Sequence, residues 1–188
     1  PAVRRLALEE LAAHHLSHQS IRASLDKRRA RALPLDSRFT QLFRERLAFD
    51  LTAAQERVYG EVAADLGRPR PMYRLVQGDV GSGKTVVAAL AMLSAIGHQR
   101  QAAVMAPTEL LAEQHFKSFY DWFEPLGIRV VWLGGRQTAR QRRDALAALA
   151  CGEANIAVGT HALFQADVRF AALSLAVIDE QHRFGVHQ

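Results

Sequence analysis

The sequence predicts an α/β domain with a parallel sheet and helices on both of its faces. From Asp50 onward, short apolar segments of strand length alternate with longer segments whose apolar residues follow a helical period. A glycine-rich octamer at 78–85 stands between one expected strand and the next expected helix. Strands joined by single helices need crossover connections, which are right-handed and make neighbouring strands parallel.

The expected elements follow in regular order along the chain. Thr52 is the expected N-cap of a helix that runs to about Leu66, because its hydroxyl can accept a hydrogen bond from a free backbone N–H. Short apolar runs mark the strands, and longer periodic segments mark the helices. The further strands are expected at 73–77, 102–106, 129–133, 155–158 and 175–178, and the further helices at 85–96, 109–123 and 138–150.

The first 46 residues differ from the rest of the chain. Residues 3–32 favour one or two polar helices, and the basic run at 27–31 followed by Pro34 is typical of a frayed end and a linker. Residues 1–46 hold ten Arg and Lys against five Asp and Glu, so this segment is either a phosphate-facing surface or an ordinary solvated helix face. We therefore divide the chain into a helical linker, 1–46, and an α/β domain, 47–188.

Composition limits the cellular setting. The chain has 188 residues, which is enough for one domain and a short appendage. It contains no run of 18 apolar residues, so we expect no membrane partner. Cys151 is the only cysteine, which excludes an internal disulfide and fits a reducing cytoplasm. We expect a cytoplasmic protein.

The octamer has the full spacing G-x-x-x-x-G-K-[ST] of a phosphate-binding loop. Its glycines let successive backbone N–H groups turn toward one point, where the positive end of the following helix favours the polyphosphate of a nucleotide. Lys84 would reach the β- and γ-phosphates, and Thr85 would offer its hydroxyl to Mg²⁺. The alternative is a chance glycine turn. The nucleotide-binding candidates here are Gly78, Asp79, Val80, Gly81, Ser82, Gly83, Lys84 and Thr85.

Two carboxylates follow the apolar strand expected at 175–178. Asp179, at the strand tip, would hold the Mg²⁺ shell, and Glu180 would polarise the water that attacks the γ-phosphate. Such a pair can also be a plain turn. His182 completes an Asp-Glu-x-His sequence, and its alternative interpretation is a structural residue that caps the strand.

Four stretches together resemble the first RecA-like motor domain of superfamily 2 helicases, and most closely the RecG family of bacterial ATP-dependent DNA helicases. The motor domain of transcription-repair coupling factors is similar in the same places and is the alternative. It ranks second because it usually differs in the phosphate-loop interior and at the third position of the acidic sequence. The resemblance covers nearly the whole chain and is weakest over 1–45. The stretches are 77–85, 105–115, 158–163 and 178–186.

The resemblance implies further nucleotide contacts. It makes 51–55 the adenine-recognition segment, with Phe49 just ahead of it. The amide of Gln55 has suitable chemistry, because it can pair with adenine N6 and N7 at once. On its own, Gln55 also fits a solvated helix position. The resemblance assigns to His182 the coupling of the ATP site to the nucleic-acid cleft.

The resemblance also implies contacts with the nucleic-acid backbone, for which hydroxyls and free N–H groups at helix starts are suitable. Thr108 has simple helix capping as its alternative, and the double glycine at 134–135 is more often a turn. The candidates are Pro107, Thr108, Glu109, Gly134, Gly135, Gly159, Thr160 and His161.

In the RecG family, a wedge domain splits branched DNA and a second RecA-like domain completes the ATP site with arginine fingers. We therefore expect an enzyme that couples ATP hydrolysis to translocation on double-stranded and branched DNA, with negligible hydrolysis by the isolated 188 residues. A stand-alone nucleotide-binding module is the alternative. A GTPase would need an Asn-Lys-x-Asp sequence, and the chain contains none.

Overall fold

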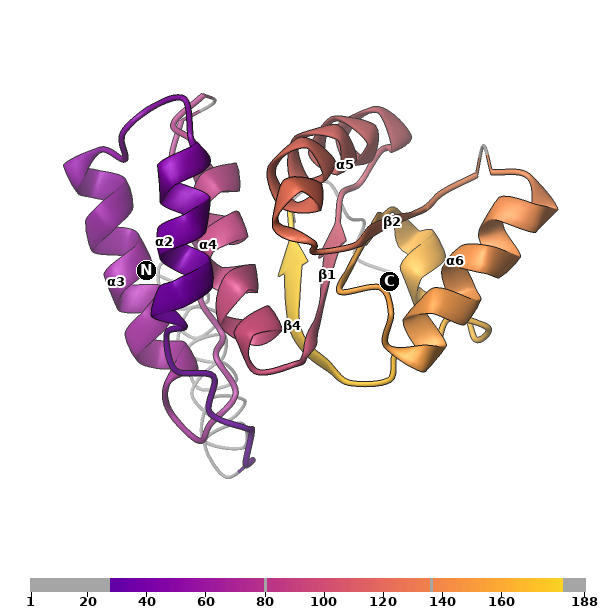
Figure 1. Cartoon of the computed structure of the whole chain (residues 1–188), viewed down its shortest axis with the longest axis horizontal. Coiled ribbons are helices and arrows are strands. Elements are labelled where there is room, and N and C mark those ends of the chain that lie inside the picture. The colour runs from indigo at the N-terminus through magenta and orange to yellow at the C-terminus, as the bar shows by residue number, and fades with distance from the viewer. Residues whose placement is uncertain (1–27, 80, 136, 181–188) are drawn as a thin grey trace, which may run out of the picture.

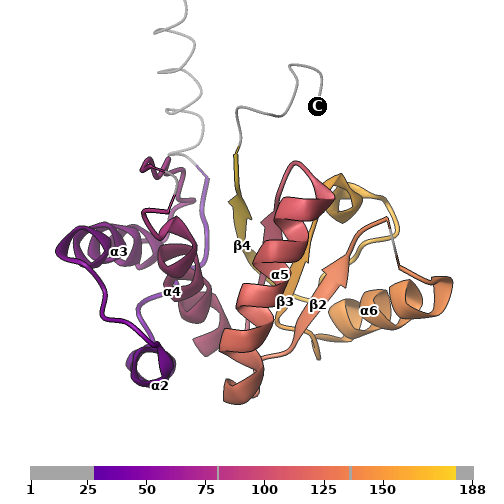
Figure 2. The same cartoon turned by 90° about the horizontal axis from the view of Figure 1, so that it is seen from above.

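The chain forms a four-stranded parallel sheet in the computed structural model, which describes residues 28–79, 81–135 and 137–180. The strand order is β2-β3-β1-β4, and every neighbouring pair is parallel (Figure 1 and Figure 2). The parallel sheet predicted from the crossover pattern is confirmed. The strands are β1 (Gln101–Met105), β2 (Val130–Leu133), β3 (Ile156–Gly159) and β4 (Leu173–Ile178).

Helices cover both faces of this sheet, as the sequence predicts. Helices α4 and α5 lie against one face with α3 and α2 outside α4, and α6 lies against the other face (Figure 2). Two short 3-10 helices, η1 and η2, follow α5 and β3. The elements are α2 (Ser37–Arg46), α3 (Ala53–Leu66), α4 (Lys84–Gly97), α5 (Glu109–Phe123), η1 (Glu124–Leu126), α6 (Ala139–Cys151) and η2 (His161–Phe164).

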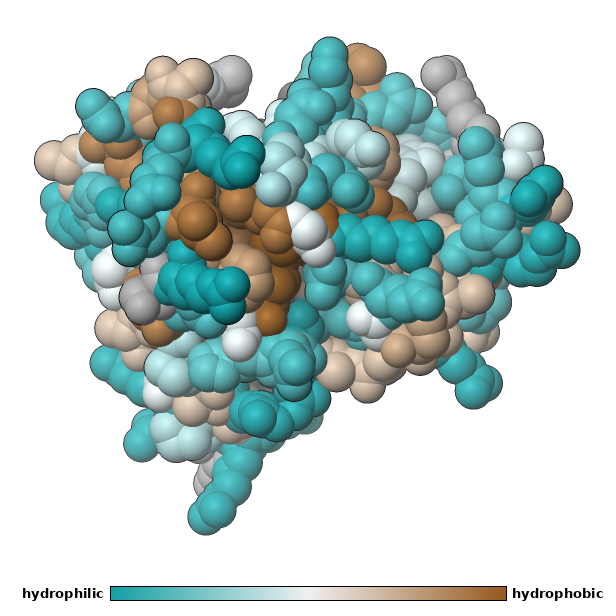
Figure 3. Space-filling model, viewed as in Figure 1, coloured by the Kyte–Doolittle hydropathy of each residue, from teal (hydrophilic) through white to brown (hydrophobic). Residues whose placement is uncertain are grey.

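Strands β1, β2 and β3 each supply side chains to two separate cores because successive side chains point to opposite faces, whereas β4 supplies the larger core alone. In β1, Ala102 and Val104 join the larger core with α4 and α5, whereas Met105 joins the smaller core with α6. In β3, Ile156 lies in the larger core and Ala157 in the smaller one. On the side of the larger core, apolar side chains also reach the surface between α2 and α5, over α4 (Figure 3).

Helix α2 was not predicted as a separate element, although it lies within the expected helical segment 1–46. Asp36 caps it by accepting hydrogen bonds from the N–H groups of Arg38 and Phe39, at 2.9 and 3.2 Å. Its Phe43 is fully buried in the larger core. Residues 28–36 contain no helix, and the remainder of the helices expected at 3–32 lies outside the described residues.

An ion pair joins α2 to α3. The guanidinium of Arg44 donates two hydrogen bonds, 2.6 and 2.8 Å long, to the carboxylate of Glu56. This contact raises the pKa of Arg44, mainly through the hydrogen bond itself.

Helix α3 begins with the predicted cap: Thr52 and Gln55 exchange hydrogen bonds between side chain and backbone in a capping box.

The strand predicted at 73–77 is wrong. Residues 71–79 belong to no helix or strand, and Tyr73 and Leu75 are 68% and 70% exposed. The guanidinium of Arg74 instead binds Asp65 and Glu61 of α3, each at 2.6 Å, and the hydrogen bond to Asp65 is the main cause of its raised pKa. An apolar run of strand length forms a strand only where another strand's backbone is available to pair with it, and in the described part of the chain none lies beside this segment.

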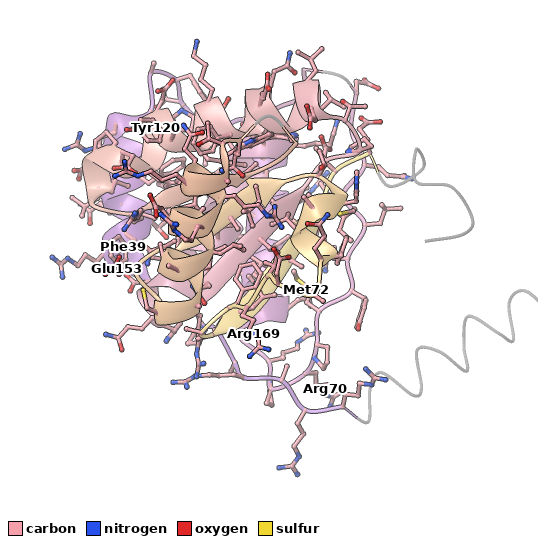
Figure 4. All side chains as sticks on the ribbon, turned by 90° about the vertical axis from the view of Figure 1, so that its right-hand side faces the viewer. Phe39, Arg70, Met72, Tyr120, Glu153 and Arg169 are labelled. Carbon is pink, nitrogen blue, oxygen red and sulfur yellow. The ribbon has the colours of Figure 1, made fainter. Side chains whose placement is uncertain are left out.

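The same segment lies at the margin of the molecule. Arg70 is exposed at its outer edge (Figure 4), whereas Met72 is half-buried against the larger core.

Within the described residues, no helix combines the length and the apolar character needed to cross a bilayer.

Candidate functional site

The candidate nucleotide site lies at the edge where the parallel strands end. Helix α4 runs antiparallel to β1, so its N-terminus is at the same edge as the carboxyl ends of β1 and β4 (Figure 1). Asp179 follows β4 directly, and its N–H donates a 2.8 Å hydrogen bond to the carbonyl of Met105 at the end of β1. The sheet thus brings the phosphate loop and the acidic pair to one edge, where ligands of such sheets bind.

The backbone of the loop has the form that an anion cradle requires. Gly81 and Gly83 have φ of +84° and +78°, a region that side chains disfavour. Gly83 is the N-cap of α4 and supplies no side chain to satisfy the first N–H groups of the helix. The Val86 N–H donates to the Gly83 carbonyl at 3.1 Å, so the N–H groups of Lys84 and Thr85 ahead of it are the ones we expect phosphate oxygens to meet. A Cβ on Gly78 would lie 2.6 Å from the Ser82 hydroxyl, which would have to rotate away.

Lys84 is folded back over this loop. Its Nζ donates to the carbonyls of Gly78 and Asp79, at 2.7 and 3.0 Å. The Ser82 N–H donates to the Asp79 carbonyl at 3.1 Å and tightens the turn. An ammonium group has three hydrogens, so one remains for a further acceptor at the loop. Thr85 is half-buried in the first turn of α4, and Val80 lies outside the described residues.

Gln55 touches the loop directly. Its Nε2 donates to the Ser82 carbonyl at 3.0 Å, while its Oε1 accepts from the Thr52 N–H at 2.9 Å. Each amide atom keeps one further hydrogen-bonding position, which leaves room for adenine. The pairing of Gln55 with adenine stays a prediction. Phe49, nearby in sequence, is exposed and accessible to a flat ring.

The acidic end has a partner that sequence reasoning did not assign. Nε2 of His115 lies 2.7 Å from Oδ2 of Asp179. His115 belongs to one of the stretches that carry the resemblance, but sequence spacing gives no sign of a contact 64 positions away. Glu180 has φ of +49°, a left-handed conformation that costs on the order of 1 kcal/mol for such a residue. His182 lies outside the described residues.

The candidate nucleic-acid contacts fall in three stretches, 107–109, 134–135 and 159–161. A hydrogen bond joins the first two. Thr108 caps α5 and accepts from the Leu111 N–H at 3.3 Å, so the predicted capping role is present. Oε1 of Glu109 accepts from the Gly135 N–H at 2.7 Å and links the start of α5 to the end of β2. Gly135 and Thr108 are exposed there.

Several other candidates of this group are enclosed by protein. Gly159 is buried, and a Cβ on it would collide with the carbonyl of Leu133 in the neighbouring strand. Gly134 is buried too, and a Cβ there would meet the ring of Trp132. Thr160 is only 4% exposed, whereas His161 is exposed. The two glycines therefore have packing roles, and His161 is the side chain of this third stretch that reaches the surface.

The oxygen atoms that the site offers to a metal fit Mg²⁺. The Thr85 hydroxyl and the Asp179 carboxylate are hard oxygen ligands, which Mg²⁺ prefers. The described residues contain no group of three or more His, Cys, Asp or Glu side chains that could enclose a metal. Such a site suits a cation held by one or two protein oxygens together with the phosphates of its nucleotide.

A glycine cradle ahead of a helix, with a lysine inside it and an acidic strand end at the same edge of a parallel sheet, is the arrangement of the P-loop NTPases. Comparison with known families is more specific: the chain belongs to the DEAD/DEAH box helicases, whose family model matches residues 52–188.

Several relatives of this chain are named RecG. The chain is 54% identical over all 188 residues to the ATP-dependent DNA helicase RecG of Escherichia coli O157:H7, and 46% identical over 191 aligned positions to that of Bacillus subtilis (strain 168). It covers 27% and 28% of these relatives, so it spans about a quarter of their length. The predicted resemblance to RecG is confirmed.

A solved structure agrees. The fold matches the structure of RecG bound to a three-way DNA junction with a TM-score of 0.87 and 41% identity, over 97% of this chain and 25% of that one. The RecA-like α/β fold predicted from the sequence is therefore confirmed.

Proposed function

We propose that the chain is the ATP-binding part of a DNA helicase that remodels branched DNA such as forks and Holliday junctions. The proposal rests on the topology: the helix that follows the phosphate loop starts at the sheet edge where β4 leads into the acidic pair, and α5 with its candidate backbone contact starts at this edge too. Similarity to RecG, including a RecG structure titled as bound to a three-way DNA junction, supports branched DNA as the substrate.

In this proposal the nucleotide lies along the start of α4. Phe49 and Gln55 hold adenine, and the loop with Lys84 holds the phosphates. Thr85 and Asp179 hold Mg²⁺, which when bound supplies positive charge against the phosphate oxygens. Glu180 accepts a proton from the attacking water. His182 couples this site to the nucleic-acid cleft.

The nucleic-acid backbone lies across the ends of β2, β3 and β1. The exposed Thr108, Gly135 and His161 are the direct contacts we favour, with Pro107 and Glu109 beside them. Gly134 and Gly159 let the chain pack closely beneath them, and Thr160 is buried beside Gly159, so these three act on the contact indirectly. A wedge domain and a second RecA-like domain, in the part of the full-length protein beyond these residues, are the intramolecular partners.

Two substitutions in the full-length protein test the ATP site. Lys84→Ala removes the charge in the phosphate loop, so we expect loss of binding to a fluorescent ATP analogue and no unwinding of a model fork. Glu180→Gln keeps the shape but not the base, so nucleotide should bind while turnover falls roughly 10²-fold or more. Lys117→Ala, an exposed lysine of α5, is the matched control and should behave as wild type. Wild-type turnover in Glu180→Gln would remove that residue from the mechanism.

A further inference from the structure

We propose that His115 is a positioning residue that orients the carboxylate of Asp179 and connects it to the start of α5. This inference rests on the proposed function, because it concerns the same Mg-ATP site. Its basis is the contact between Nε2 of His115 and Oδ2 of Asp179, 2.7 Å long.

The contact fixes the direction of one carboxylate oxygen. An ionised carboxylate only accepts hydrogen bonds, so Nε2 of His115 is the donor. The two side chains are 16% and 26% exposed, which leaves the contact mostly screened from solvent. With Oδ2 held by His115, Oδ1 is the oxygen directed to a cation or its bound water. Hydrogen bonds to a metal-ligating carboxylate commonly set its orientation in this way.

The imidazole is itself held in place. Its ring stacks on that of Phe119, one helical turn further along α5, with centroids 5.9 Å apart and an angle of 16° between planes. Phe119 is fully buried and stacks in turn on Phe123. The orientation of His115 therefore follows the position of α5 and does not adjust freely to Asp179.

The N-terminus of α5 is the candidate nucleic-acid contact. Thr108 caps the helix seven residues before His115, about 10 Å along its axis at 1.5 Å per residue. Asp179 is attached to the sheet through its N–H bond to Met105. A shift of α5 against the sheet when DNA binds at Thr108 would therefore change the direction of the Asp179 carboxylate through His115. This gives a physical route by which DNA stimulates hydrolysis.

The test uses the full-length protein with His115→Ala and His115→Gln. The first readout is the dissociation constant of fluorescent ADP at increasing Mg²⁺. The second is the kcat and KM of ATP hydrolysis with and without a DNA fork, and fork affinity is measured separately. Gln114→Ala, the exposed neighbour on the same helix, is the control.

For His115→Ala we expect the Mg²⁺ requirement for tight ADP binding to rise about tenfold. Fork-stimulated kcat should fall by a similar factor while fork affinity and KM stay near wild type. His115→Gln should bring both the Mg²⁺ requirement and the fork-stimulated kcat most of the way back to wild type, because its amide N–H can reach the same oxygen. The inference is overturned if His115→Ala keeps the wild-type Mg²⁺ requirement and stimulation, or if Gln is no better than Ala.

A failure of the proposed function gives a different result. If wild type and Lys84→Ala bind ADP equally and neither responds to Mg²⁺, the nucleotide site itself is misassigned. If wild type binds and Lys84→Ala does not, but His115→Ala matches wild type, the nucleotide site stands and the role of His115 is refuted.

Discussion

Replacing Gly83 by alanine tests how α3 and the phosphate loop depend on each other. Gly83 has φ of +78°, and a Cβ there would collide with Nε2 of Gln55. The left-handed backbone alone costs about 1–2 kcal/mol for alanine. Displacing Gln55 adds the loss of its bond to Ser82, about 1 kcal/mol, and of its part in the Thr52 capping box, about 1 kcal/mol. We expect Gly83→Ala to lower the free energy of unfolding by roughly 3–4 kcal/mol.

A double-mutant cycle separates these contributions. In a Gln55→Ala background the amide is already absent, so Gly83→Ala should cost only the 1–2 kcal/mol of backbone strain, roughly. Gly81→Ala is the matched control: its φ is +84° but nothing lies within 4 Å of its Cβ, so its cost should be the same in both backgrounds. Urea unfolding followed by tryptophan fluorescence measures all of these variants. Additivity of Gly83→Ala and Gln55→Ala within about 0.5 kcal/mol would refute the coupling.

Three further substitutions test the fold. Gln101→Leu removes three hydrogen bonds, two buried and one part-buried, that its amide makes to backbone groups, so urea unfolding should show a loss of about 3 kcal/mol. Phe43→Ala empties a fully buried site against Trp122 and should cost about 3–5 kcal/mol, with a shift in tryptophan emission. Burial raises the pKa of Tyr59 above its ordinary value of 10.0. The stability that the neutral phenol contributes is therefore complete below pH 10 and is lost as the pH rises through the higher folded-state pKa. Tyr59→Phe should flatten this alkaline decline in the free energy of unfolding, and an unchanged slope would contradict the reasoning.

Features that depend on neighbouring residues were predictable from the sequence. Thr52 and Thr138 each cap a helix where a Thr precedes a Gln by three positions, and both capping boxes form. The phosphate loop is equally local, since its octamer stands ahead of α4 and its glycines take the expected left-handed torsions. The parallel sheet followed from chain connectivity.

Features that depend on distant partners were not predictable. The run 73–77 has strand-like composition, but the described sheet ends at β4 and Arg74 is held by α3. The contact between His115 and Asp179 spans 64 positions. Gly159 stays a predicted backbone contact, but the closeness of the Leu133 carbonyl, which requires glycine there, could not be foreseen. No sequence pattern records how near two backbones come.

The burial of Phe43 determines where this chain can be divided experimentally. Sequence composition suggests a boundary after residue 46, but Phe43 packs against Trp122 and Phe123 in the same core as α4. A truncation starting at residue 47 would uncover those two aromatic rings and leave Glu56 without Arg44. Expression clones or domain chimaeras should therefore begin before Asp36, so that they include the capped helix α2 together with the α/β domain.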